Sequence, residues 1–140
     1  MIPTNLIKAA EPTSTDSAIA MRLTPSGTDW SYAAATTGIV NTTTAVTIKT
    51  AAGAGIRNRV SSIQIMAEAL GAATELAIRD GAGGTVLWRT KIGTGGLTTG
   101  ETIVFANPLF GTANTLLEVV TLTASVTGAV YFNAQGDTRI

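Results

Sequence analysis

A hairpin pattern at residues 70–92 is the feature of this sequence that most constrains its fold. Two runs rich in Val, Ile, Thr, Trp and Leu, residue types that favour a half-buried pleated surface, flank the segment Asp-Gly-Ala-Gly-Gly at residues 80–84. Glycine supplies the positive φ values that tight hairpin bends need. The segment lacks the Lys-Ser/Thr of a phosphate-binding loop and no helical pattern follows it, so we interpret it as a turn. The pattern therefore predicts an all-β protein.

Short apolar or alternating runs recur along the rest of the chain, at the close spacing that is typical of a β-sandwich or barrel. We expect about eight antiparallel strands after the N-terminal region. Nine runs are candidates for these strands: residues 30–32, 39–40, 46–49 and 57–66, the two strands of the hairpin, and residues 102–105, 116–123 and 129–135. Residues 93–96 and the pair Asn107-Pro108 are expected to be loops between strands.

Two of these strands carry a more detailed expectation. In residues 57–66, Ile63 and Ile65 share a face but Val60 is out of phase with them, which predicts a β-bulge near residues 61–62.

The hairpin allows a similar expectation about its faces. Leu76 and Ile78 are expected to point inward from its first strand, and Val86 and Trp88 from its second.

The N-terminal region has a different composition from the rest. Residues 1–29 hold three of the four prolines and a Thr/Ser/Asp cluster at residues 13–17, which disfavours a compact core. We expect an extended N-terminal arm that includes one strand, because Ile19, Met21 and Leu23 alternate with smaller or polar residues. Residues 30–140 are then expected to form a single β-sandwich domain.

The surface of this protein is expected to be nearly neutral. Only 13% of the 140 residues are charged, and nine positive charges balance nine negative ones. Because charge repulsion keeps proteins apart in solution, this composition indicates a surface that a partner covers, although a merely Thr-rich small fold is the alternative. No apolar run has the length of a membrane helix or of a signal peptide, so we expect a soluble protein without a membrane partner.

The sequence offers little catalytic chemistry. It contains no histidine and no cysteine, which removes the commonest general base, the commonest metal ligand and the best nucleophile. The acidic residues are scattered singly, without the paired set of a glycosidase. We therefore expect no enzyme activity, no catalytic residues, no cofactor and no metal.

The basic residues do not indicate nucleic-acid binding, because they make no net positive field. Arg57 and Arg59 share one face of a strand, and Arg89 and Lys91 share a face of another. We expect Lys91 to protect a strand edge from unwanted pairing. For Arg57 and Arg59, contact with a carboxylate on a partner protein remains open.

Several stretches of the chain resemble a known family. They are GAGIRNRVSSIQI, ALGAATELAIRDGAGGTVLWRTKI and PLFGTANTLLEVVTL, with NAQG near the end. They are similar to small virion proteins of tailed bacteriophages and prophages over about residues 18–136. Size and composition are similar to the cement, or decoration, proteins of phage capsids. The resemblance implies a jelly-roll β-sandwich that sits as a homodimer on the outer surface of the virion capsid and clamps neighbouring major capsid protein subunits.

Candidate contact residues follow from this expectation. We predict that the apolar residues Ile2, Leu6 and Ile7 of the arm, and the aromatic pair Trp30 and Tyr32, contribute to contacts between subunits. Core packing is the alternative for the aromatic pair. A tail or head-fibre module that binds a host surface glycan or receptor is the alternative function, and a carbohydrate-binding or lytic domain is a second alternative.

Overall fold

The computed structural model describes residues 27–40, 42–123 and 127–140. These residues form nine β-strands and no helix, so none of them forms a helical membrane span. The all-β prediction is confirmed. The strands are β1 (Asp29–Tyr32), β2 (Ile39–Val40), β3 (Val46–Lys49), β4 (Arg57–Ala67), β5 (Thr74–Asp80), β6 (Thr85–Ile92), β7 (Leu97–Phe110), β8 (Leu117–Thr121) and β9 (Ala129–Arg139). The predicted arm strand at residues 19–23 lies outside the described residues.

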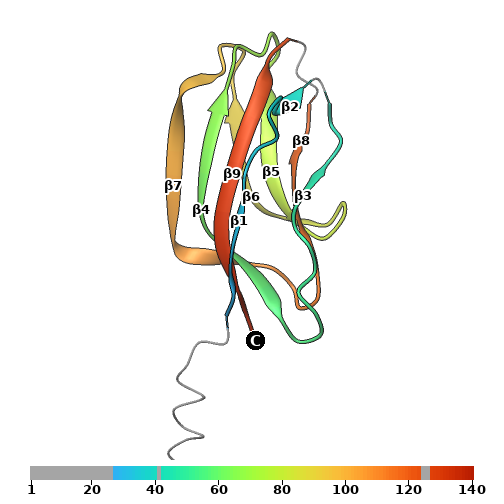
Figure 1. Ribbon diagram of the computed structural model, residues 1–140. Helices are drawn as coiled ribbons and strands as arrows, with labels where there is room; N and C mark the ends of the chain where they lie inside the picture. Colours follow the sequence, from blue (N-terminus) through green and yellow to red (C-terminus); the bar gives the residue numbers. More distant parts are fainter. Residues whose placement is uncertain (1–26, 41, 124–126) are drawn as a thin grey trace, which may run out of the picture.

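The strands form two sheets that face each other. The larger sheet has the order β1-β9-β4-β7, with β2 also paired to β9, and the smaller sheet has the order β3-β8-β5-β6 (Figure 1). With β2 set aside, the first strand pairs with the last (β1 with β9), β3 with β8, β4 with β7, and β5 with β6, always antiparallel. The chain is thus one long hairpin rolled into two layers, which is the jelly-roll arrangement. The hairpin predicted at residues 70–92 is the tip of this roll.

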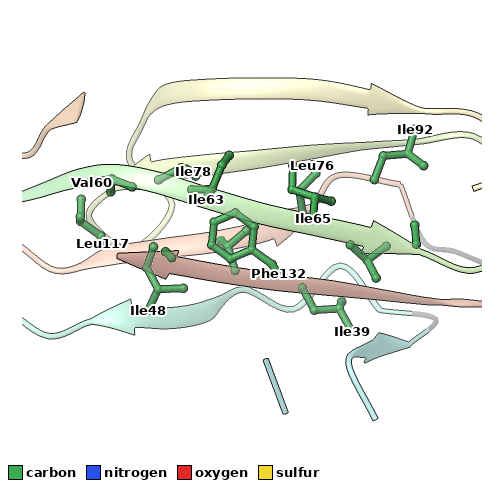
Figure 2. Packing of buried hydrophobic residues seen from close by; sticks show 14 of the residues in the cluster. Ile39, Ile48, Val60, Ile63, Ile65, Leu76, Ile78, Ile92, Leu117 and Phe132 are labelled. Atoms are coloured by element: carbon green, nitrogen blue, oxygen red, sulfur yellow. The ribbon is translucent and has the colours of Figure 1, made fainter. Parts of the chain in front are cut away.

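The hydrophobic core fills the space between the sheets (Figure 2). Phe132 of β9 lies near its centre and is 1% exposed. Leu76 and Ile78 of β5 are fully buried and belong to this core, as their alternation predicts. The same alternation leaves hydroxyl, amide and charged side chains on the outer faces, because successive residues of a strand point to opposite sides of a sheet.

The bulge predicted near residues 61–62 is present. The register of β4 shifts between Val60 and Ser62 in its pairing with both neighbours, β7 and β9. Val60 and Ile63 are both buried although they lie three residues apart. The extra residue of the bulge brings the two side chains to the same face of the strand.

The prediction for the seventh strand was wrong in part. Instead of ending before a loop at Asn107-Pro108, β7 continues to Phe110. Its pairing with β4 passes from Val104, opposite Ser62, to Leu109, opposite Val60. The intervening residues 105–108 take no position in that register. Proline has no backbone N–H to donate. It is tolerated here because β7 is an edge strand, and among the described strands none lies on its outer side to accept such a hydrogen bond.

The second strand of the hairpin also differs from its prediction. Its register passes from Trp88, opposite Ile78, to Val86, opposite Arg79, so Leu87 is an extra residue. Leu87 and Trp88, not Val86 and Trp88, therefore pack against the core. A bulge changes which residues face inward, and nothing in the local alternation reveals it.

The tip of the roll is tied down by two carboxylates. Asp80 accepts a hydrogen bond from the backbone N–H of Thr112 at 3.0 Å. Oε1 of Glu118, on β8, accepts one from the backbone N–H of Gly83 at 2.9 Å and another from Nε of Arg79 at 2.7 Å. These bonds link the turn to the strand and the loop beside it, so residues 80–84 are a supported turn.

Candidate interaction surface

The described residues contain no group of three or more His, Cys, Asp or Glu side chains that could hold a metal ion. Three carboxylates instead make ion pairs with arginines of the same chain. These pairs are Arg59–Asp137, Arg139–Asp137, Arg79–Glu118 and Arg89–Glu75. The side chains of Asp137 and Glu118 are only 10% and 6% exposed, so the ion pairs of these two carboxylates stabilise the fold.

The aromatic pair predicted as a contact site lies against the core. Trp30, on β1, is 9% exposed, and its Nε1 donates a hydrogen bond to the backbone oxygen of Asp137 at 3.2 Å. Tyr32 is half-buried and packs against the same core. The geometry of Trp30 therefore fits core packing, the alternative that the sequence left open.

Arg59 meets a carboxylate of its own chain. Its Nε and Nη2 donate to Oδ1 and Oδ2 of Asp137, each at 2.7 Å, which makes a bidentate ion pair between β4 and β9. Nε of Arg139 donates to the same carboxylate at 2.8 Å. The Arg59 guanidinium also lies 5.2 Å from the centre of the Phe110 ring. Arg57 is exposed, and a carboxylate partner for it stays a prediction.

This pairing changes the acidity of the groups involved. Hydrogen bonds from Arg59 lower the pKa of Asp137 below its ordinary value; burial opposes this change and Arg139 adds to it. Hydrogen bonding to Asp137 likewise raises the pKa of Arg59, against a smaller effect of burial. A carboxyl group with a lowered pKa in the folded state stabilises the fold above the pKa of the unfolded chain, about 3.9. That stabilisation is lost as the pH falls through the folded-state pKa.

We expect Asp137→Asn to lower the free energy of unfolding by about 1.5 to 3 kcal/mol at pH 7, because it leaves Arg59 without its charged acceptor. The deficit should shrink as the pH is lowered below about 4, where Asp137 of the wild-type protein also becomes neutral. Urea denaturation at several pH values measures both effects. Glu75→Gln is the control: it breaks an exposed pair at 3.6 Å and should cost less than about 1 kcal/mol. A deficit of equal size at pH 7 and pH 2.5 would contradict this account.

The edge strand β7 carries the most exposed apolar side chains among the strands of the larger sheet. Val104 and Phe110 of β7 are 75% and 47% exposed, and their register partners, Ser62 and Arg59, are partly buried on β4. Glu101 is the one charged residue of this 14-residue strand. In monomeric proteins, long edge strands usually carry charged side chains that prevent pairing with a strand of another molecule. We name Val104, Phe110 and the strand between them the β7 edge.

Sequence reasoning missed the β7 edge. Ile103, Val104 and Phe105 are three consecutive apolar residues, so their alternation did not show which one faces outward. Ile103 and Phe105 pack against the core, and the Phe105 ring meets Trp88 edge to face at 6.4 Å between ring centres. That inward pairing leaves Val104 as the outward residue of the three.

The other predicted surface residues have mixed outcomes. Lys91 is exposed on β6, which is an edge strand of the smaller sheet, so its predicted position at an edge is confirmed. Arg89, on the same strand, pairs with Glu75. Ile2, Leu6 and Ile7 lie outside the described residues, and their predicted role stays a prediction.

Comparisons with known proteins add little to this geometry. No family model matches the chain, and no curated protein matches it. Among solved structures it is similar to the tobacco streak virus coat protein, with 11% identity and a TM-score of 0.40 over 81% of this chain and 85% of that one. It is also similar to the VP2 subviral particle of infectious bursal disease virus, with 15% identity and a TM-score of 0.30 over 81% of this chain and 32% of that one.

Proposed function

We propose that this chain is a structural virion protein that binds the outside of a phage head. There it clamps neighbouring major capsid protein subunits and stabilises the shell. Two things support the proposal: the resemblance of several stretches to small virion proteins of tailed phages, and the jelly-roll order of the strands. A fold alone does not assign a function, so the proposal depends on a surface that fits the role.

The observation that carries the proposal is the β7 edge. It offers exposed apolar side chains beside backbone groups that pair with no other described strand, on a sheet whose core side chains hold it rigid. Such an edge can accept an extended segment of a partner through backbone hydrogen bonds, with Val104 and Phe110 filling adjacent depressions of the partner. The low charge of the chain agrees with contacts that are apolar and neutral.

Modest contacts are sufficient for a protein of this kind. A clamp that touches two subunits of an assembled shell binds the second one intramolecularly, at a high effective concentration. Weak contact energies therefore add together over the lattice. The resemblance implies a homodimer, and each bound dimer would make twice as many contacts with the shell as a monomer. Sedimentation velocity of the purified protein tests whether it is a dimer.

Purified protein mixed with phage heads that lack it should co-sediment with the heads and raise the temperature at which they open. Val104→Asp places a charge on the β7 edge and should weaken this binding by about tenfold or more, equivalent to about 1.4 kcal/mol. Val40→Asp is the matched control, because Val40 is also exposed but lies on β2. Failure of the wild-type protein to bind would contradict the function, and equal binding by both variants would contradict the role of the β7 edge.

The N-terminal arm has its own test. Deletion of residues 1–12, which removes Ile2, Leu6 and Ile7, should weaken co-sedimentation with the heads while the fold of the sandwich is kept. Circular dichroism checks the fold of the shortened chain. Unchanged binding would contradict the predicted contacts of the arm.

A further inference from the structure

The outer face of the larger sheet has a trough over β9 and its two neighbours. Five polar side chains line it: Ser31 from β1, Asn133 and Gln135 from β9, and Ser62 and Gln64 from β4. Its volume is about 230 Å³, and it continues into a broader depression that shares Ser31 and Gln135 with it. We call this depression, defined by its five side chains, the outer trough.

The cross-strand register explains how the side chains come together. Gln135 lies opposite Ser31 on one side and Ser62 on the other, which makes one row across three strands. Asn133 lies opposite Gln64 in the next row. Neighbouring strands are about 4.8 Å apart, so each strand-to-strand step adds that width, and the three strands span about 10 Å.

Small residues make the face hollow at this point. Ser31 and Ser62 are short, and the bulge of β4 lies at Ser61 beside them.

The hydrogen-bonding groups of the outer trough are free to meet a ligand. The side chains of Ser31, Ser62, Gln64 and Gln135 make no hydrogen bond to any other residue that the structure describes. Oδ1 of Asn133 accepts a bond from the backbone N–H of Ala34 at 2.9 Å, which orients its amide and leaves the NH₂ group as a donor. Hydroxyls and carboxamides both donate and accept hydrogen bonds.

The charge of this region limits the class of ligand. None of the five side chains is charged, so the trough provides neither the cations that bind phosphate or carboxylate nor the anions that bind a metal. Asp29 borders the broader depression, and Asp137 beside it is paired with Arg59, so this row offers no unpaired cation to an anionic ligand. A neutral ligand with many hydroxyl or amide groups fits this set.

A peptide fits the outer trough less well than a carbohydrate. Peptides commonly bind β-sheets by adding a strand at an edge, where backbone groups are unpaired. The floor of the trough is β9, which is paired on both sides by β1 and β4. Only side chains can therefore contact the ligand. Met66 of β4 lies opposite Tyr131 of β9, in the row next to Gln64 and Asn133. These two side chains add apolar surface for the C–H groups of a sugar ring.

We propose that the outer trough binds a neutral glycan. Each site is shallow and open, so its affinity is low, in the millimolar range; many copies displayed together on one particle would bind a glycan-bearing surface strongly by multivalency. The activity goes beyond shell binding and uses a different part of the molecule. The β7 edge is on the far side of β4 from β1, so a copy held by that edge keeps the β1 side of the trough open.

The test uses the free, full-length protein. Chitotriose, maltotriose, mannotriose and lacto-N-neotetraose are the neutral probes, and sialyllactose is the acidic one. We expect at least one neutral probe to shift the side-chain amide signals of Gln64, Asn133 and Gln135 in ¹H–¹⁵N NMR spectra, and sialyllactose to bind more weakly. The double variant Gln64→Ala/Gln135→Ala should weaken that binding by about tenfold or more through two lost hydrogen bonds.

The control is Thr47→Ala/Lys49→Ala on β3 of the smaller sheet, which should bind the probe as the wild-type protein does. Both double variants change surface side chains, and their melting temperatures show whether the fold is intact. The proposal is overturned if no neutral probe shifts those signals or if only the acidic probe does. It is also overturned if Gln64→Ala/Gln135→Ala binds the neutral probe as well as the wild-type protein. Because no heads are present, this outcome is independent of whether the protein binds a shell.

Discussion

Replacing Gly136 by alanine is expected to leave little folded protein. An added Cβ at this position would lie 1.8 Å from the backbone oxygen of Arg59 and 2.6 Å from the ring of Trp30. The first atom belongs to the backbone of β4 in the middle of the larger sheet, so it cannot move without breaking the pairing of β4 with β9. We expect a loss of more than about 4 kcal/mol, which is close to the whole stability of many small domains.

Gly93→Ala is the matched control for this substitution. Gly93 lies in the loop between β6 and β7, and an added Cβ there would meet no atom within 4 Å. The free energy of unfolding of Gly93→Ala should stay within about 0.5 kcal/mol of the wild-type value. Urea denaturation of the three proteins measures the difference. A Gly136→Ala protein with an unchanged midpoint would show that β4 and β1 do not pack beside β9 as described.

Phe132→Ala should lower the free energy of unfolding by about 3 to 5 kcal/mol. Phe132 lies near the centre of the core, surrounded by side chains from both sheets (Figure 2). The substitution removes the ring and leaves a cavity that these neighbours can fill only in part. Phe132→Leu keeps much of the volume and should cost clearly less.

Val104→Ala is the control for the core substitution, because this side chain is mostly exposed and its loss should change stability by less than about 0.5 kcal/mol. Thermal unfolding followed by circular dichroism ranks the four proteins. If Phe132→Ala were as stable as Val104→Ala, the two sheets would not enclose one shared core.

Local sequence patterns were sufficient for those parts of the fold that depend on neighbouring residues. The hairpin at residues 70–92 was predictable because its strands and glycine-rich turn are contiguous. The bulge of β4 was predictable because the phase of its apolar residues changes within one strand. By contrast, Pro108 was expected to end a strand, since only the sheet order shows that β7 is an edge where a proline is tolerated.

Long-range contacts were outside the reach of such patterns. Arg59 pairs with Asp137, 78 residues away, which no local spacing indicates. Asn58 is fully buried, and its Nδ2 donates to backbone oxygens of Thr50 and Thr115, so a residue type that is usually exposed holds two loops together. The outer trough has the same origin: its polar side chains come from three strands that only the roll brings side by side.

The proposed site of action is the outer surface of a phage head, and electron microscopy of purified virions tests it most directly. Cryo-electron microscopy should show regularly spaced density for this jelly roll on the outside of the head, bridging adjacent capsid subunits. The same density should be missing from particles made without the protein. Density found at the tail alone, or on no part of the particle, would contradict the account.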